Sequence, residues 1–400
     1  MTGAAEERPD PRSDLRAALT ELLARELPAA IELRHELHAS AELSGAESAT
    51  AAAVAAALGQ AQAPAVAGTG RLIRIGPRAG SSIAVRAELD ALPIAEETGV
   101  PWACRTGAMH ACGHDVHLAA LAALGRAAAA CSDRLPAALL AVLQPREEIA
   151  PSGAREIAAS AAFAAQSPAA VVGVHLQHQL PAGTVAAAAG TINAATDDFE
   201  ITVTGTGGHA GYPQLAADPV LALCQSVVSV QQLVSRRIDP THAAVVSVGT
   251  LRAGSAPNVI PATAAATGTM RTLDQRDRQF LRTALADVVE HVCRAHGCQG
   301  TVAVTPHEPA LVNDARLTAR CRPMLRQAGF SVDAEFRSCG ADDFSYYADT
   351  APSVMLFLGS GTKVSLHHPQ FLPADEAVGQ VAEAMLAGYL AAVPIASETD

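Results

Sequence analysis

The sequence has few basic residues. Lys and Arg together number 28 against 40 Asp and Glu, which gives a formal net charge of -12. A nucleic acid or an anionic membrane surface needs a cluster of basic side chains to neutralise its phosphates, and the sequence contains no such cluster. We therefore expect a small-molecule substrate, with no nucleic-acid and no membrane partner.

Long apolar runs are also lacking. The first 16 residues are polar and acidic, without the basic flank and apolar stretch of a signal peptide, and no uninterrupted apolar run elsewhere would span a bilayer. These absences predict a cytoplasmic protein. Hydrophobic residues still make up 50% of the 400 residues, enough to bury one large core or two smaller ones, so a disordered chain is excluded.

The cysteines lack the spacing of a disulfide framework. There are 8 of them, scattered along the chain, and no C-x-x-C pair occurs that would support a redox role. In a reducing compartment most of them should be buried thiols. Cys112 is the expected exception, because of the residues around it.

Short apolar runs alternate with helical segments in the first half of the chain. Residues 70–75, 82–89, 139–143 and 170–174 predict strands, the last two of the continuously apolar kind that is covered on both faces. Apolar spacing predicts helices over residues 15–38, 46–58, 117–130 and 153–165. This alternation predicts a layered α/β sheet with mostly parallel strands.

The pattern changes after Gly190. Strands at 198–204, 243–251, 262–271 and 301–305 and helices at 219–234 and 274–295 follow in the order β-α-β-β-α-β, the split ferredoxin-like pattern. The α/β style then resumes, with helices over 313–327, 341–348 and 375–391 and a strand over 353–358. The expected fold is α/β: a discontinuous layered catalytic domain (residues 1–192 and 307–400) interrupted by a ferredoxin-like lid (residues 193–306).

The segment 109–117 concentrates three His, a Cys and an Asp. Residues two apart in an extended segment point the same way, so Cys112 and His114 can present a thiolate and an imidazole to one metal ion. A buried thiol and helix-capping histidines are the alternative, which this density of ligand-type residues disfavours. Asp115 either caps the following helix or holds a ligating imidazole.

Two adjacent carboxylates, Glu147 and Glu148, directly follow the strand predicted over 139–143. Such a pair resists desolvation unless cations or metals compensate its charge. One carboxylate can ligate a metal while its neighbour takes a proton from metal-bound water, whose pKa falls from about 15.7 to near 7. An exposed loop paired with Arg146 or Arg155 is the alternative, and the dipeptide alone favours it.

Further histidines end two other segments. His175 closes the apolar run 170–174, where a lone His is more often a core residue than a ligand, and His367 and His368 lie in a loop before a proline. Imidazole, thiolate and carboxylate together are the ligand set of zinc-like ions, with Mn, Co or Ni also compatible. The roles of His110 and His117 stay open.

The order and wording of these blocks resemble a known family. The blocks are Arg86–Pro93, His110–Asp115, Gln144–Glu148, His175, Gly207–Ala210, Asn258–Pro261 and His367–Phe371. They are similar to those of the metal-dependent aminoacylase/carboxypeptidase metallopeptidase clan, and within it to the branch of hippurate hydrolases, indole-acetyl-amino-acid hydrolases and N-acyl-amino-acid deacylases. The resemblance covers nearly the whole chain, from about Arg34 to Phe371.

The resemblance implies a metal-dependent amidohydrolase that splits N-acyl amino acids into a carboxylic acid and a free amino acid. It implies two divalent metal ions per subunit (Zn, Mn, Co or Ni), with Cys112, His114, Glu148, His175 and His367 as ligands and Glu147 as general base. Asp90 is retained at a catalytic motif position. In the lid of a homodimer that forms through this domain, His209 and Asn258 would stabilise the oxyanion or hold the substrate carboxylate, and His209 could serve the site of a neighbouring subunit.

Some positions depart from the family's wording. Glu88 stands where Asp is common, residues 176–179 replace a block with an aromatic and a Pro, and residues 149–153 replace a glycine-rich run. His178 could therefore join the site, while the His-x-Pro-x-Phe wording favours His367 over His368. Two alternatives remain: a dipeptidase or carboxypeptidase of the same clan, and a catalytically silent metal- or peptide-binding protein, which would not need Glu147.

Overall fold

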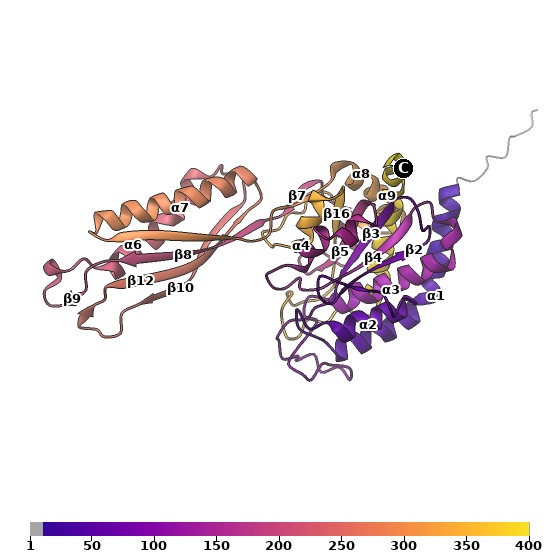
Figure 1. The fold of residues 1–400 in the computed structure, drawn as a ribbon, viewed down its shortest axis with the longest axis horizontal. Helices are drawn as coiled ribbons and strands as arrows, with labels where there is room; N and C mark the ends of the chain where they lie inside the picture. Colours follow the sequence, from indigo (N-terminus) through magenta and orange to yellow (C-terminus); the bar gives the residue numbers. More distant parts are fainter. Residues whose placement is uncertain (1–10, 400) are drawn as a thin grey trace, which may run out of the picture. The chain divides into compact units, whose positions relative to one another are not determined.

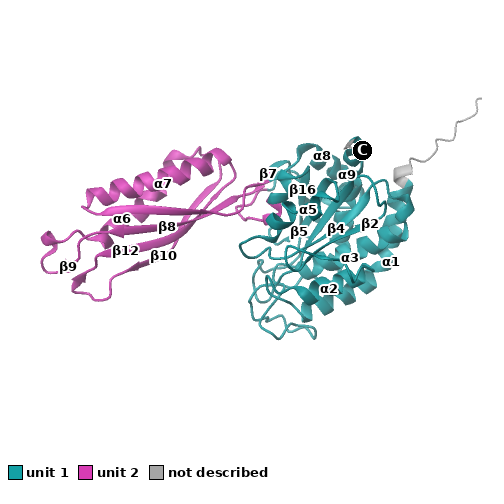
Figure 2. Ribbon diagram, viewed as in Figure 1, with its two compact units in different colours: residues 1–190, 312–336, 346–400 teal, residues 191–311, 337–345 magenta. Residues whose placement is uncertain are grey.

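The protein, described here by a computed structural model over residues 11–399, divides into two compact units (Figures 1 and 2). Unit 1 is formed by the chain up to Gly190, by Val312–Phe336 and by the chain from Tyr346 onward, and unit 2 by Thr191–Leu311 and Arg337–Ser345. Residues 337–345 thus fall in unit 2, although the expected boundaries assign them to the second part of the catalytic domain. Residues 1–10, on which the expectation about a signal peptide partly rests, lie outside the described residues.

Unit 1 is built on an eight-stranded sheet with the order β1-β2-β4-β3-β5-β16-β6-β15. Its centre consists of parallel strands, namely β4 (Ala138–Gln144), β3 (Ser82–Glu88), β5 (Pro168–Gln177) and β16 (Ser353–Gly359). The flanks are β1 (Ala65–Val66) and β2 (Gly70–Ile75) on one side, and β6 (Thr184–Ala186) and β15 (Ser331–Asp333) on the other. The predicted mostly parallel α/β sheet is confirmed.

Helices bury one face of this sheet in a single large core. They are α1 (Pro11–Ala39), α2 (Ser48–Ala57), α3 (His114–Ala130), α8 (Ala315–Gln327) and α9 (Glu376–Thr399). Successive strand residues alternate between faces. In β3, Ile83, Val85 and Ala87 join this core, so Arg86 and Glu88 point to the other face.

Helix α9 is long and apolar enough to cross a membrane, and it is the one such helix among residues 11–399. The stretch Glu376–Glu398 has a mean hydropathy of 1.4, but 72% of its apolar window is buried inside the structure. Tyr389 of this helix donates a hydrogen bond to the carbonyl of Ala137 at 2.7 Å. A helix in the core of a protein can be equally long and apolar, and the burial and the hydrogen bond of α9 are those of a core helix.

Unit 2 has the predicted ferredoxin-like arrangement. Its elements are β8 (Ala195–Thr204), α6 (Pro219–Gln232), β10 (Ala244–Ala253), β12 (Thr263–Thr272), α7 (Gln275–Ala295) and β13 (Gln299–Pro306). The strands form an antiparallel sheet in the order β10-β12-β8-β13, and α6 and α7 pack on it around a second core. The chain passes between the units in β7 (Gly190–Asn193), in β14 (Leu311–Asn313) and on either side of residues 337–345.

Local side-chain chemistry explains where the helices differ from expectation. The helix predicted over 153–165 is divided into α4 (Gly153–Ala158) and α5 (Ala161–Ala164), because the hydroxyl of Ser160 donates to the carbonyl of Ile157 and accepts from the amide of Phe163. The predicted helix over 341–348 is a 3-10 turn, η4 (Asp343–Asp349). Helix α3 starts at His114 rather than His117. Gly113, with φ +86°, has a left-handed backbone conformation, so the right-handed helix begins directly after it.

Candidate metal centre

The residues singled out in the sequence follow the ends of the central parallel strands. Asp90 lies just after β3, Glu147 and Glu148 lie just after β4, His175 is near the end of β5, and His367 is in the segment after β16. Carboxyl ends of parallel strands meet at one edge of a sheet, where α/β proteins bind their ligands. The fold of unit 1 therefore brings these residues together.

Cys112 lies at the middle of the cluster. Its Sγ is 3.5 Å from Nε2 of His175 and 3.5 Å from Nε2 of His367, and Nε2 of His367 is 3.5 Å from Oε1 of Glu148. Cys112 and His175 are buried, whereas the His367 side chain is 52% exposed. A centre with one open side can hold ions and still admit a substrate.

His367 is held at the cluster by a rare backbone conformation. Its φ is +64°, in the left-handed region that residues other than glycine seldom adopt. Its amide donates to the carbonyl of Ala111 at 2.9 Å. That bond fixes the segment of His367 against the residue before Cys112.

Glu148 belongs to two groups of possible ligands. Cys112, Glu148 and His367 offer atoms within 4.8 Å of one another, and so do His114, Glu147 and Glu148. Two overlapping groups that share a carboxylate are compatible with two neighbouring ions. Burial alone would raise the pKa of Glu148, but its hydrogen bond with His367 and the nearby His114 and His175 lower it.

The buried histidines are oriented with Nε2 toward the cluster. Nδ1 of His114 donates to the carbonyl of Asp90 at 2.8 Å, and Nδ1 of His175 donates to the carbonyl of Leu176 at 2.7 Å. A carbonyl only accepts, so Nδ1 carries the proton and Nε2 keeps its lone pair. Nε2 of His114 is buried without a hydrogen-bond partner, which is the state of an imidazole prepared to bind a cation.

Asp90 lies behind the ligand-type residues. Its Oδ2 accepts from the Ser44 hydroxyl at 2.6 Å and from the Glu148 amide at 3.0 Å, while its own carbonyl accepts from His114. Burial raises the pKa of this carboxyl, and His114 and Ser44 offset part of that effect. Asp90 thus orients two possible ligands at once.

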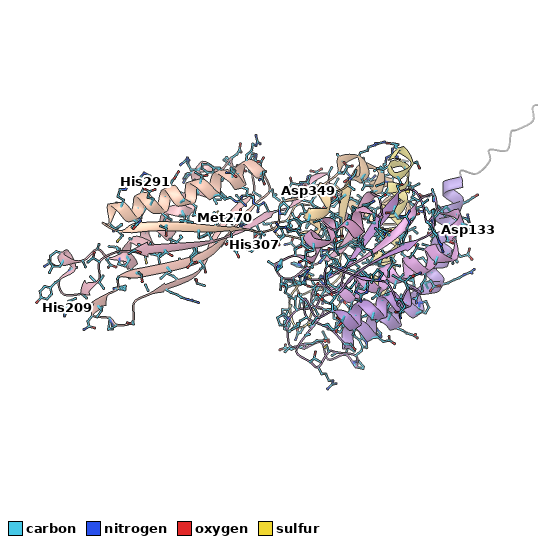
Figure 3. The ribbon with its side chains drawn as sticks, viewed as in Figure 1. Asp133, His209, Met270, His291, His307 and Asp349 are labelled. Carbon is cyan, nitrogen blue, oxygen red and sulfur yellow. The ribbon has the colours of Figure 1, made fainter. Side chains whose placement is uncertain are left out.

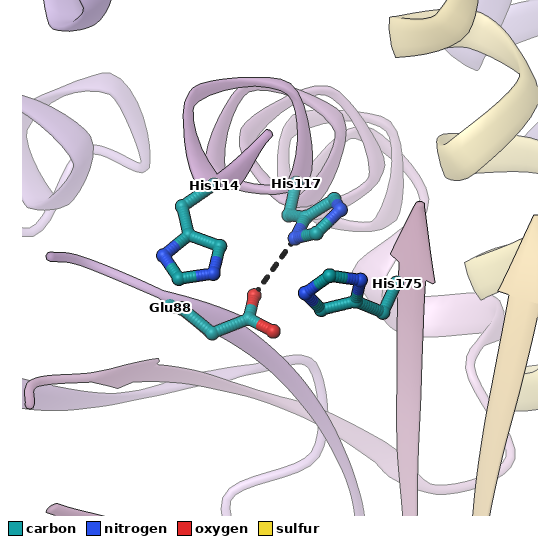
Figure 4. Close-up of side chains that lie close together, drawn as sticks. All are labelled: Glu88, His114, His117 and His175. Carbon is teal, nitrogen blue, oxygen red and sulfur yellow. Dashed lines mark hydrogen bonds and ion pairs between the residues drawn. The ribbon is translucent and has the colours of Figure 1, made fainter. Parts of the chain in front are cut away.

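A buried ionic layer lies next to the cluster. Glu88 accepts hydrogen bonds from Arg86 and from Nδ1 of His117, the latter at 2.9 Å (Figure 4). Burial alone would raise the pKa of Glu88, but Arg86, His117 and His114 hold it well below its usual value. In the sequence Glu88 is recognisable only as a departure from the family's wording, and the role of His117 stays open. Their pairing joins β3 to α3, and such a contact between two elements is not visible along the chain.

Asp115 neither caps α3 with its side chain nor contacts a cluster histidine. Its carboxylate accepts from Nε of Arg34 at 3.1 Å and from Nδ1 of His38 at 3.0 Å. Burial would raise the pKa of Asp115, but Arg34 and His38 hold it far below its usual value. Arg34 and His38 belong to α1, so this contact fixes the first turn of α3, and with it His114.

The remaining histidines do not join the cluster. Burial lowers the pKa of His110 to about 3, so this residue is neutral. His368 is half-buried and accepts from the Gln370 amide at 3.1 Å. Neither His178 nor His368 belongs to a group of possible ligands among residues 11–399.

His209 and Asn258 lie together in unit 2. His209 is in β9 (Gly208–His209), which pairs with β11 (Val259–Ile260), and the amide of Ala210 donates to the carbonyl of Asn258 at 3.1 Å. His209 is exposed at one end of the unit (Figure 3), and its Nδ1 accepts from the amide of Gly211 at 2.9 Å. Its Nε2 can therefore face a ligand.

Known proteins are similar to this chain over most of its length. The sequence profile of peptidase family M20/M25/M40 matches residues 84–391. N-acetylcysteine deacetylase of Bacillus subtilis is 33% identical over 354 residues, which span 87% of this chain and 92% of that protein. N-acetyldiaminopimelate deacetylase of Shouchella clausii is 35% identical over 329 residues, 82% of this chain and 87% of that protein.

A solved structure shares both the fold and part of the sequence. The Bacillus subtilis YxeP protein, described as a dinuclear metal-binding peptidase of the M20 family, superposes with a TM-score of 0.81 at 30% identity. The match covers 94% of this chain and 100% of that one.

Proposed function

The chain belongs to peptidase family M20/M25/M40 and is a hydrolase of amide bonds, and from this premise we propose that it cleaves N-acyl amino acids into a carboxylic acid and a free amino acid. Two relatives support this substrate class, since each is named for removing an acetyl group from an amino acid. The observation that carries the proposal is the convergence of Cys112, His175, His367 and Glu148 at the edge of the sheet.

In this proposal two divalent metal ions, Zn, Mn, Co or Ni, are held by Cys112, His114, Glu148, His175 and His367. The donor set fits such ions, because it combines a thiolate, a carboxylate and imidazoles. The free Nε2 of His114 supports the assignment. When bound, such ions supply Lewis acidity to the scissile carbonyl and to the attacking water.

Glu147 is the proposed general base. It follows the ligand-bearing strand end, and one of its oxygens lies within 4.8 Å of ligand atoms of His114 and Glu148. From that position Glu147 takes a proton from the attacking water and returns it to the leaving amine nitrogen. Asp90 touches the backbone of Glu148 and the Nδ1 of His114, so its role is to position these groups.

The proposal assigns substrate binding to unit 2. His209 and Asn258 would stabilise the oxyanion or hold the carboxylate of the amino-acid part, in a homodimer formed through this unit. An imidazole and an amide that lie next to each other can both donate to an anionic oxygen. We expect this small-molecule reaction to take place in the cytoplasm.

The test is a substrate panel with apoprotein reloaded with single metals. N-acetyl and N-benzoyl amino acids are compared with unblocked dipeptides, and release of the free amino acid is measured. The proposal expects metal-dependent release from the acylated substrates. Release from unblocked dipeptides alone would instead identify a dipeptidase, and no release from either class by metal-loaded protein would indicate a silent binding protein.

A further inference from the structure

Glu88, His114, His117 and His175 form a fully buried group whose ligand atoms lie within 4.8 Å of one another (Figure 4). By distance alone this group could hold a metal ion. Two of its members, however, already use their polar atoms in hydrogen bonds within the protein. Glu88 is paired with Arg86 and His117, and His117 is bonded at both ring nitrogens.

Nε2 of His117 accepts a hydrogen bond from the amide of Leu176 at 3.1 Å. The pairing of β5 with β3 ends at Gly173, so β3 offers this buried amide no carbonyl. A buried amide is rarely left without an acceptor. The imidazole of His117 therefore replaces the missing strand partner.

Glu88 fixes the proton of His117. Its carboxylate accepts from Nδ1 at 2.9 Å, which places the proton on Nδ1 and leaves Nε2 as an acceptor. Arg86 holds Glu88 in turn, and Nε of Arg86 donates to Oε1 of Gln144 at 2.9 Å. The side chains of β3 thus determine which nitrogen of His117 meets Leu176.

The backbone of Leu176 is held at both its amide and its carbonyl. Its amide is bonded to His117, and the carbonyl of Leu176 accepts from Nδ1 of His175 at 2.7 Å. That second bond turns Nε2 of His175 toward Cys112, 3.5 Å away. A shift of Leu176 would therefore rotate the imidazole of His175.

We propose that His117, fixed by Glu88, is a positioning residue that orients the imidazole of His175 in the metal centre, and that His117 is not itself a ligand. The inference rests on the metal centre of the proposed function. It does not depend on which amide the enzyme cleaves, because its test measures metal binding alone.

The experiment measures affinity for Co²⁺ and Zn²⁺ by chelator competition in the full-length protein and in His117→Phe, at a temperature where circular dichroism shows both folded. Loss of an outer contact of a ligating histidine typically weakens metal affinity by about 10–100-fold. We expect that loss with unchanged metal stoichiometry at saturation and a shifted Co²⁺ absorption spectrum. Unchanged affinity overturns the inference, and a saturating stoichiometry lowered by one ion makes His117 a ligand and overturns it too.

Further variants separate positioning from loss of packing. In His117→Gln the new side chain can still accept from the Leu176 amide, so this variant should lose less metal affinity than His117→Phe. An equal loss in both variants would refute the role of His117 as an acceptor. Glu88→Gln should weaken affinity in the same direction. Tyr389→Phe, which removes a buried hydrogen bond to the carbonyl of Ala137 at 2.7 Å, just before β4, should leave affinity unchanged. If the unaltered protein binds neither metal, the metal centre fails together with this inference.

Discussion

At the scale of residues, the candidate centre depends on which ring nitrogen of each histidine carries the proton. His114 and His175 each donate a hydrogen bond from Nδ1 to a backbone carbonyl, and so each keeps the lone pair of Nε2. The carbonyls belong to residues at the ends of β3 and β5, so the sheet itself sets the tautomers. Metal affinity should consequently depend on residues that never touch the ion.

Glu147 can be separated from the ligands by substitution. Glu147→Gln keeps size and hydrogen bonding but removes the base, so turnover should fall by about 100- to 10,000-fold while bound metal stays unchanged. Metal content by mass spectrometry and kcat on an N-acyl amino acid are the two measurements. A variant that comes out metal-free would make Glu147 a ligand.

Cys112 should act as a thiolate ligand. Cys112→Ala removes the sulfur that lies 3.5 Å from two imidazoles, and metal affinity should fall by about 10-fold or more. Chelator competition measures the change. Cys321→Ala is the matched control, because burial raises the pKa of that thiol to about 12 and it packs in the core of unit 1. Equal metal affinity in the two variants would remove the thiolate assignment.

Sequence could identify the candidate residues but not their partners. Glu148 and His175 lie at strand ends that share one edge of the sheet. The start of α3 and the segment after β16 bring Cys112, His114 and His367 close to them. The bond between His117 and Leu176, in contrast, depends on the point where β3 stops pairing with β5. Nothing in either residue's neighbourhood along the chain marks that point.

At the scale of elements, hydrophobic patterning predicted the central strands well because it reports burial on both faces. Strand β2 has the predicted bounds, Gly70–Ile75, and β3 ends one residue earlier than predicted, at Glu88. The short strands β6 and β15 were missed, since three residues are too few to show a period. The division between α4 and α5 depends on one hydroxyl, that of Ser160, which a count of apolar residues does not detect.

Unit 2 depends on a buried ion pair that joins β8 to α7. Asp197 accepts from Nε of Arg278 and Nε of Arg282, both at 3.0 Å. Arg278 also donates to the carbonyl of His307, just after β13. Asp197→Asn leaves a buried guanidinium without its counter-charge, so unfolding free energy should fall by about 3–5 kcal/mol. Thermal unfolding checks this. Asp287→Asn, at an exposed position of α7, is the control and should change little.

The same pair predicts a pH dependence. Burial would raise the pKa of Asp197, but hydrogen bonds from Arg278 and Arg282 lower it below the ordinary 3.8. A carboxyl with a depressed folded pKa stabilises fully above its unfolded pKa and loses that contribution as pH falls through the folded value. The difference in stability between the protein and Asp197→Asn should therefore be constant near neutral pH and shrink below about pH 4. A difference at pH 2 as large as that at neutral pH would contradict the assignment.

At the scale of the whole molecule, unit 2 carries an apolar surface that its own core does not use. On α6, Leu221 and Val228 are 56% and 67% exposed and lie two turns apart on one face, while Ala222, Leu223 and Val230 face the core. Strand β10 is an edge strand of the same sheet, and Leu251 on it is 46% exposed. An apolar helix face beside an unpaired strand edge favours association with a second copy.

If the homodimer forms through this surface, a charged side chain placed there would lose its water on association. The free-energy cost of that loss weakens the dimer. Val228→Asp should weaken association by about 100-fold or more, whereas Thr283→Asp on the exposed side of α7 should not. Sedimentation equilibrium over a range of concentrations measures both. Because the proposed metal ligands all lie in unit 1, a monomeric Val228→Asp variant should keep its metal affinity. Loss of activity in that monomer would then indicate that the substrate contacts, His209 among them, are made only in the dimer. A Val228→Asp protein that stays dimeric would place the interface elsewhere.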